Sequence, residues 1–262
     1  MQPSLSHSYV TVVPAYRAVP TDSEVLALAQ LKRLSVENIT LVCPNYLDVS
    51  AYLALVSDLH VVRLSEEHFK SVQSYNTLML QPWFYELFTC DYEWMLIHQL
   101  DAFLLTNQIQ KFCDLGYHYY GAPWLIGFPQ YRFLLNRWPI KINRKRFQVG
   151  NSGLSLRHLE KTVDLLQRKQ DHVSKTFFME DAFFGYWGSM DQYFRACPVN
   201  IAATFSLESH PEHWVGLTHT LPMGFHGHGI WSQDFYKPLD QAFAELSTEF
   251  PHLQNKAQAS YT

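Results

Sequence analysis

The chain has 262 residues, of which 47% are hydrophobic and 17% charged, a size that suits one large or two small globular domains. The formal net charge is −4 and the densest basic cluster is short (141–146), which argues against nonspecific nucleic-acid binding. The start of the chain lacks the pattern of a signal peptide, and no apolar run approaches the roughly 20 residues of a membrane span. The four cysteines are scattered without a C-x-x-C pair, which indicates free buried thiols in a reducing, cytoplasmic compartment.

The first third of the chain alternates strands with helices. β-Branched and apolar runs predict strands at 9–14, 39–43 and 59–64. Helices are predicted between them, one beginning at a capping box formed by Thr21 and Glu24 and one at 49–56. This alternation favours a mostly parallel central sheet flanked by helices, an α/β fold.

The next strand predicted ends in polar residues. An apolar run at 95–97 gives way to His98, Gln99 and Asp101 before the chain turns apolar again. Open α/β sheets place ligand sites at such strand ends. Asp101 is therefore expected either to face a ligand or to cap a turn, and both interpretations stay open here.

In the rest of the chain, predicted strands and helices alternate less regularly. Two prolines and several aromatic residues interrupt 128–146, which indicates a long loop that serves as a lid or an acceptor-binding insertion, although a solvated loop is an alternative. No repeat or linker is found, so one domain is expected. Helices are expected at 66–72, 108–115, 157–170, from 179 and at 240–250, and a late strand at 200–205.

A glycine-rich turn precedes the helix expected at 157–170. Gly150 and Gly153 would let the backbone approach a ligand closely, and Asn151, Ser152 and Ser155 would supply hydrogen bonds. A tight turn or bulge without a ligand explains the same residues equally well.

Two further clusters carry ionisable side chains. Glu180 and Asp181 begin a helix, where a carboxylate can act as a general base on a hydroxyl or simply stabilise the helix N-terminus. His226 and His228 flank a glycine and form either a metal-binding loop or an accidental pair among 13 histidines.

Together these strings resemble one family, over about residues 9–231. It is a group of bacterial glycosyltransferase-like proteins, catalogued as a domain of unknown function and often encoded with surface-polysaccharide genes. The strings that carry the resemblance are Pro14-x-Tyr16, Tyr75-Asn-x-Leu-Met, Leu96-Ile-His-Gln-Leu-Asp-Ala-Phe, Tyr120-Gly-Ala-Pro-Trp, Val149-Gly-Asn-Ser-Gly-Leu-Ser-Leu-Arg157, Glu180-Asp181 and Gly224-Phe-His226.

The resemblance implies a single GT-A (Rossmann-like) domain over 1–262. Its nucleotide-binding half would span about 9–105, its donor and acceptor half about 106–250, and a polar tail about 251–262. The resemblance also implies a nucleotide site and a donor-sugar site. The nucleotide site would hold Pro14, Tyr16, Arg17, Tyr75, Asn76, Gln99 and Asp101, and the donor-sugar site Asn151, Ser152, Gly153, Ser155 and Arg157.

The resemblance further implies a divalent cation, Mn²⁺ or Mg²⁺, held by Asp101, His226 and His228. The family's Asp-x-Asp motif is altered here, because Gln99 stands where the first acid is usual. A neutral amide oxygen is a weaker ligand for a hard cation, so dependence on metal is left open.

The implied activity is a hexosyltransferase-type transfer from a nucleotide-sugar, with UDP as the expected nucleotide, to a glycan or glycolipid acceptor. Asp181 would be the general base of an inverting reaction, and Glu180 would bind sugar or acceptor. The expected location is cytoplasmic, with a peripheral contact at the inner membrane compatible with the sequence. Two alternatives stay open: a GT-A-like module that binds nucleotide or carbohydrate without catalysis, and a metal-dependent phosphoester hydrolase.

Overall fold

The computed structural model describes residues 6–129, 146–150, 153–176, 179–227 and 245. Its main sheet has six strands in the order β3-β2-β1-β4-β9-β6. The strands are β1 (Tyr9–Pro14), β2 (Ile39–Pro44), β3 (His60–Leu64), β4 (Trp94–His98), β6 (Tyr119–Tyr120) and β9 (Leu154–His158). β1 to β4 are parallel, and β9 runs antiparallel to both of its neighbours. The prediction of a mostly parallel sheet is confirmed.

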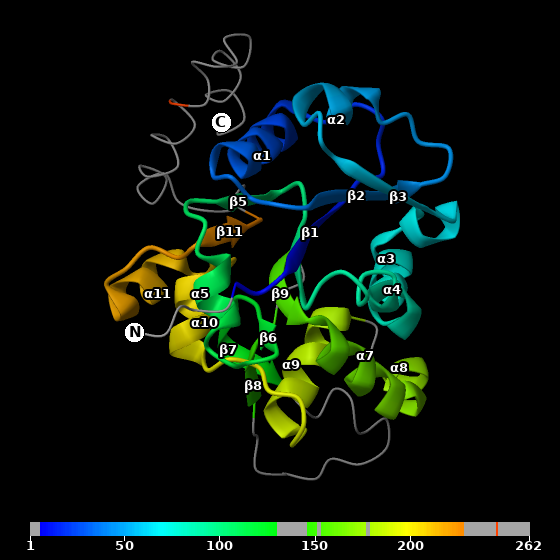
Figure 1. The fold of residues 1–262 in the computed structure, drawn as a ribbon. Helices are drawn as coiled ribbons and strands as arrows, with labels where there is room; N and C mark the ends of the chain where they lie inside the picture. Colours follow the sequence, from blue (N-terminus) through cyan, green and yellow to red (C-terminus); the bar gives the residue numbers. More distant parts are fainter. Residues whose placement is uncertain (1–5, 130–145, 151–152, 177–178, 228–244, 246–262) are drawn as a thin grey trace.

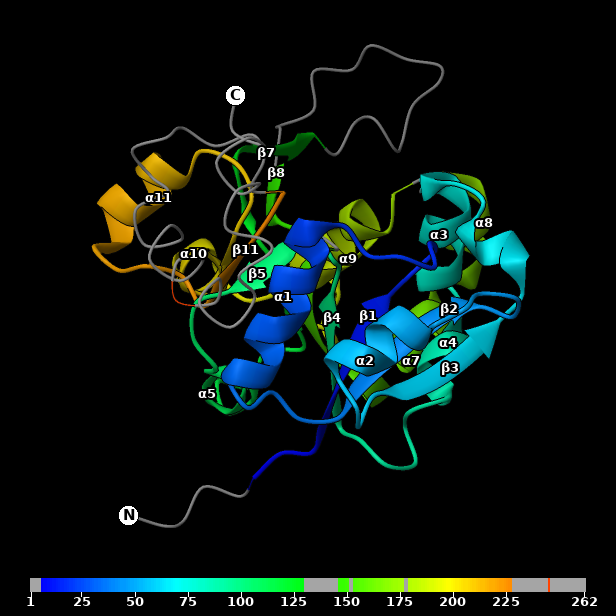
Figure 2. The same cartoon turned by 90° about the horizontal axis from the view of Figure 1, so that it is seen from above.

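Helices cover both faces of this sheet (Figures 1 and 2). On one face lie α1 (Asp22–Arg33) and α2 (Ser50–Leu55). On the other lie α3 (Val72–Met79), α4 (Pro82–Glu86), α7 (Leu159–Arg168) and α9 (Glu180–Met190). The capping box that begins α1 is confirmed, since Thr21 Oγ1 accepts from Glu24 N and Glu24 Oε2 accepts from Thr21 N at 2.7 Å.

A second, three-stranded sheet packs beside the first. It is formed by β10 (Ser206–Leu207), β11 (Gly224–His226) and β5 (Ala102–Leu104), with β11 antiparallel to β5. Near it lie α5 (Ile109–Cys113), α10 (Val199–Phe205) and α11 (Pro211–Thr218) (Figure 1). β5 follows β4 after a short turn, and β11 pairs with β5. The end of β11 therefore lies next to the carboxyl end of β4.

The remaining elements complete the described chain. β7 (Pro123–Pro129) pairs with β8 (Arg146–Val149), α8 (Gln170–Thr176) follows α7, and a 3₁₀ helix, η1 (Glu66–Phe69), precedes α3. The two ends of the loop predicted at 128–146 are therefore strands, while 130–145 lies outside the described residues. The helix predicted at 240–250 and the tail at 251–262 also lie outside them, apart from residue 245.

The strand predicted at 200–205 is wrong, because this segment is the helix α10. The predicted strand contains the β-branched residues Ile201 and Thr204, but Ala202 and Phe205 are buried one helical turn apart. Burial of this apolar face outweighs the small intrinsic preference of β-branched residues for strands. The helix predicted at 66–72 is present but shorter, as the 3₁₀ helix η1, which ends at Phe69 because Ser71 caps the separate helix α3.

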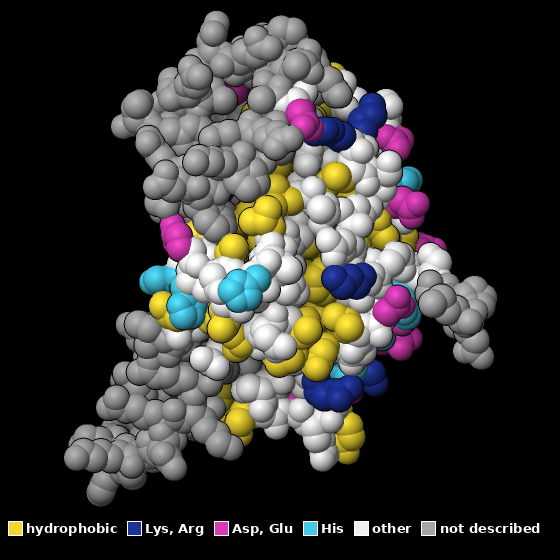
Figure 3. Space-filling model, turned by 90° about the vertical axis from the view of Figure 1, so that its left-hand side faces the viewer, with side chains coloured by type: hydrophobic (Ala, Val, Ile, Leu, Met, Phe, Trp, Pro, Cys, Tyr) yellow, Lys and Arg dark blue, Asp and Glu magenta, His cyan; other side chains and the backbone are white. Residues whose placement is uncertain are grey.

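All four cysteines are free, and Cys43, Cys113 and Cys197 are buried as predicted, whereas Cys90 is exposed. Within the described part of the chain, every helix is too short or too polar to cross a membrane. Figure 3 shows the left-hand face of Figure 1, where hydrophobic side chains gather near the centre and histidines lie to one side.

Candidate functional site

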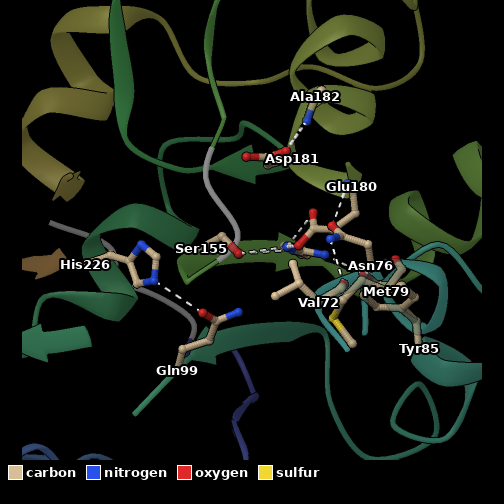
Figure 4. A network of polar contacts seen from close by, with 11 residues as sticks. Val72, Asn76, Met79, Tyr85, Gln99, Ser155, Glu180, Asp181, Ala182 and His226 are labelled. Atoms are coloured by element: carbon tan, nitrogen blue, oxygen red, sulfur yellow. Dashed lines mark hydrogen bonds and ion pairs between the residues drawn. The ribbon is translucent and has the colours of Figure 1, made fainter. Parts of the chain in front are cut away.

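Three of the side chains singled out in the sequence meet at the carboxyl end of β4. Gln99 and Asp101 lie in the turn between β4 and β5, and His226 ends β11, opposite Ala102. His226 Nε2 lies 3.2 Å from Gln99 Oε1 and 3.3 Å from Asp101 Oδ1 (Figure 4 shows the contact with Gln99). Residues more than 120 positions apart in the sequence therefore form one cluster.

A fourth member of this cluster, Glu208, was missed in the sequence. Its Oε1 lies 3.2 Å from His226 Nδ1, on the other side of the imidazole ring. Burial favours the neutral ring, but the hydrogen bonds with Asp101 and Glu208 outweigh it and raise the pKa of His226 to about 9. Glu208 belongs to no motif, and it follows β10, whose pairing with β11 no local pattern indicates.

The donor atoms of this cluster suit a divalent cation. Gln99 and Asp101 offer oxygen, and His226 would offer an imidazole nitrogen once a cation displaces the proton that Asp101 and Glu208 stabilise on the ring. The Asp101 side chain is 61% exposed to solvent. Ligands about 2.1 Å from an octahedral ion lie about 3 Å from one another, close to the separations seen here. Among the described residues no group of three His, Cys, Asp or Glu side chains forms a metal site, so the set depends on the Gln99 amide. His228 lies outside the described residues.

The two glycines of the 150–153 turn are required by packing of this chain's own rings. A Cβ atom on Gly153 would lie 1.9 Å from Cδ2 of His226, and one on Gly150 would lie 1.9 Å from Cη2 of Trp124. Gly153 O also accepts a hydrogen bond from Gln99 N at 2.8 Å. Gly153 therefore lies directly against the Gln99–His226 cluster. Asn151 and Ser152 lie outside the described residues.

Glu180 and Asp181 begin α9 and point in different directions (Figure 4). Asp181 is half-buried, and its Oδ1 accepts a hydrogen bond from Ala182 N at 2.7 Å. Burial and then the negative charge of Glu180 raise the pKa of Asp181 to about 7. A carboxyl group with this pKa can accept a proton near neutral pH.

Glu180 is fully buried and forms an ion pair with Arg157, which is also fully buried. The Arg157 Nη2 atom lies 3.1 and 3.2 Å from the two Glu180 carboxylate oxygens. The same guanidinium donates to Ser155 Oγ and to the hydroxyl of Tyr85 (Figure 4). Arg157 and Glu180, which the resemblance assigned to sugar and acceptor binding, thus contact each other rather than solvent. Tyr85 was missed because it lies in a stretch where aromatic residues crowd every position.

Asn76 joins α3 to the beginning of α9. Its Oδ1 accepts from Glu180 N at 3.0 Å and its Nδ2 donates to Val72 O at 2.8 Å. The side chain therefore satisfies one of the free backbone N–H groups of the helix N-terminus. Burial raises the pKa of its neighbour Tyr75, and the negative charge of Glu180 raises it further.

The residues after β1 lie in the loop next to the end of β4, because these two strands are parallel neighbours. Pro14 ends β1 and is buried, whereas Tyr16 is 56% exposed. Arg17 donates to the Tyr16 hydroxyl at 2.6 Å, and its guanidinium lies 4.9 Å from the Tyr16 ring centroid. Arg17 Nε also lies 3.9 Å from Glu24 Oε1, so its charge is partly balanced while the Tyr16 ring stays exposed.

Comparisons with known proteins add a family and a fold. The model of the family described as "Protein of unknown function (DUF5672)" matches residues 58–226. A search of curated proteins finds no match.

Two solved structures are similar to this one. The apo form of mouse xyloside xylosyltransferase 1 has a TM-score of 0.51 at 13% identity, covering 84% of this chain and 97% of that one. The bifunctional glycosyltransferase WbbM, also in an apo structure, has a TM-score of 0.51 at 10% identity, covering 87% of this chain. This chain spans 47% of the length of WbbM. These similarities show the fold alone, and the prediction of a GT-A architecture is confirmed.

Proposed function

We propose that this chain, which belongs to the DUF5672 family of proteins of unknown function, is a glycosyltransferase that moves a sugar from a nucleotide-sugar to an acceptor hydroxyl. One observation carries the proposal. A cation-type cluster (Gln99, Asp101 and His226) lies near a carboxyl group with a pKa of about 7, that of Asp181 (Figure 4). Glu208 touches His226 and lies within electrostatic range of Asp181, so the two centres are neighbours.

Asp181 is proposed as the general base. At pH 7 about half of the molecules carry the carboxylate, which can take the proton of the acceptor hydroxyl as that oxygen attacks the sugar. A base on the acceptor side suits an inverting reaction, in which the nucleotide leaves from the opposite face of the sugar.

The nucleotide diphosphate is proposed to lie against the Gln99–Asp101–His226 cluster. A divalent cation, Mn²⁺ or Mg²⁺, would be held by Asp101 and His226 with the Gln99 oxygen and would offset the negative charge that develops on the leaving group. Tyr16 is proposed to stack on the base and Arg17 to bind a phosphate, which is supported by the exposure of the Tyr16 ring and the charge of Arg17. UDP is the proposed nucleotide and a glycan or glycolipid the proposed acceptor.

Residues 151–153, Ser155 and their neighbours are proposed to bind the donor sugar, because Gly153 lies against the cation-type cluster and Gly150 lies against Trp124. The half of the chain at 9–105 then serves the nucleotide, and the half at 106–250 serves the sugar and the acceptor.

Binding is tested by thermal unfolding with nucleoside diphosphates and nucleotide-sugars, with and without Mn²⁺. A ligand at 100 times its Kd stabilises the native state by about 2.7 kcal/mol. A rise in Tm with a UDP-sugar that grows when Mn²⁺ is added supports the proposal. No shift with any nucleotide contradicts it.

Turnover is tested by release of nucleotide diphosphate from the donor that binds. Asp181→Asn should lower turnover at saturating donor at least about a hundredfold while leaving the thermal shift by donor in place, because Asn cannot take the proton. Near-normal turnover of this variant refutes the base assignment. Binding without turnover by the wild-type protein would instead identify a non-catalytic nucleotide-binding module.

A further inference from the structure

The Arg157–Glu180 pair is buried without access to solvent. Both side chains are 0% exposed, and a buried charge is retained only where its partners satisfy it. The guanidinium uses its donors on three partners, namely Glu180, Ser155 and Tyr85. Neither side chain is therefore available to bind a substrate.

The guanidinium is enclosed by aromatic rings as well as by hydrogen bonds. Its carbon lies 4.7 Å from the Phe184 ring centroid, 5.7 Å from that of Tyr119 and 5.9 Å from that of Tyr85. A planar guanidinium held between ring faces is fixed in one orientation, so its N–H donors point in a fixed direction toward the carboxylate of Glu180.

Glu180 is held from the backbone side as well. Its N–H donates to Asn76 Oδ1, and its carboxylate meets Arg157, so both ends of the residue are fixed. Asp181 is the next residue along the same first turn of α9. Fixing Glu180 therefore fixes the start of the helix from which Asp181 projects.

We propose that Arg157 and Glu180 are positioning residues, a buried pair anchored by Tyr85 that holds Asp181 in place and sets the charge that Asp181 experiences. This inference rests on the proposed function for its catalytic meaning. It departs from the roles of sugar and acceptor binding that the resemblance implied for Arg157 and Glu180.

The charged and titratable groups that face Asp181 come from four elements. Glu180 on α9 and Glu208 after β10 favour its neutral form, and Arg157 on β9 favours its carboxylate. Tyr119 on β6 also interacts with it. Among them Glu180 has the largest effect on Asp181, and Arg157 is the residue that fixes where Glu180 lies.

The first experiment measures the Asp181 carboxyl directly, in protein labelled with ¹³C-aspartate and titrated by NMR, with Asp181→Asn identifying the signal. Glu180→Gln keeps the shape but removes the negative neighbour and leaves the positive charge of Arg157 unopposed. Both changes favour the Asp181 carboxylate, so its titration midpoint should fall by about one pH unit or more. An unchanged midpoint overturns the proposal.

The second experiment loosens the anchor without removing a charge. The Tyr85 hydroxyl accepts from Arg157 and donates to Met79 O at 2.8 Å. Tyr120→Phe is the matched control, because its buried hydroxyl also accepts one hydrogen bond, from Tyr117 N, and donates one, to Phe112 O, away from Arg157.

Tyr85→Phe should move the Asp181 midpoint by about 0.3 unit or more and lower kcat about three- to tenfold with KM for donor unchanged. Tyr120→Phe should do neither. If the two variants have equal effects, Arg157 has only a structural role and the proposal is overturned. If Glu180→Gln does not fold, the Asp181 titration midpoint in Tyr85→Phe tests the proposal instead. The NMR result stands whether or not the wild-type protein turns over a nucleotide-sugar, so failure of the proposed function is recognised separately.

Discussion

Replacement of Asp181 by asparagine should make the protein more stable while abolishing the proposed activity. Burial and the charge of Glu180 raise the pKa of Asp181 from 3.8 to about 7, so the native state holds a proton that the unfolded chain releases. Asparagine has no charge to bury, and its side-chain oxygen can still accept the hydrogen bond from Ala182 N.

The size of the effect follows from the difference between the two pKa values. Between pH 4 and pH 7 the native state binds more protons than the unfolded chain, so the wild-type protein loses stability as the pH rises through this window. A difference of about three units corresponds to about 4 kcal/mol above pH 7, and a residual exposure of the carboxyl group reduces this to about 2–4 kcal/mol. At pH 5 the stability advantage of Asp181→Asn should be only about 1–1.5 kcal/mol, because pH 5 lies only about one unit above the pKa of Asp181 in the unfolded chain.

The assay is urea unfolding of both proteins at pH 5 and pH 8. The matched control is Asp191→Asn, for which the sign is reversed. Burial opposes ionisation of Asp191, but hydrogen bonds from Arg168 and from Tyr193 N lower its pKa to about 2, so this variant should lose stability at pH 8. If Asp181→Asn is no more stable than the wild type at pH 8, or if its advantage does not shrink at pH 5, Asp181 is not a carboxyl group with a raised pKa.

Three further outcomes are expected. Gly153→Ala should cost about 1–3 kcal/mol of stability and weaken Mn²⁺ binding in calorimetry, because the added Cβ would displace the His226 ring, and unchanged Mn²⁺ affinity would contradict this. Gln99→Asp should tighten Mn²⁺ binding about tenfold in the same assay, since a second carboxylate joins the site, and weaker binding would show that the amide is preferred there. Thr21→Ala should lower the free energy of unfolding by about 1 kcal/mol through loss of the capping box with Glu24, and an unchanged urea midpoint would refute this.

Local sequence patterns were sufficient to predict the elements whose structure depends on residues close together in the chain. β1 was predicted residue for residue, and the capping box at Thr21 marked the start of α1. These features depend on neighbours within a few positions, namely a β-branched run ended by proline and a side chain that reaches its own helix turn. The late strand failed for the opposite reason, because burial of Phe205 against distant residues decides that segment.

The candidate site divides in the same way. The resemblance to a known family implied Asp101, His226 and His228 as cation ligands and placed Gln99 at the altered position of the motif. Only the tertiary structure showed that β11 pairs with β5 and brings His226 within 3.3 Å of Asp101.

The roles of the buried residues were decided by tertiary structure alone. The family resemblance implied that Arg157 binds the donor sugar, yet its side chain is 0% exposed and lies between Glu180 and Tyr85. Gly153 was expected to let the backbone approach a ligand, yet the His226 ring occupies the position that a Cβ atom there would take. The sequence determined which chemical groups are present, and the packing of distant segments determined which of them face solvent and which face each other, because burial and pairing depend on three-dimensional neighbours that no local spacing specifies.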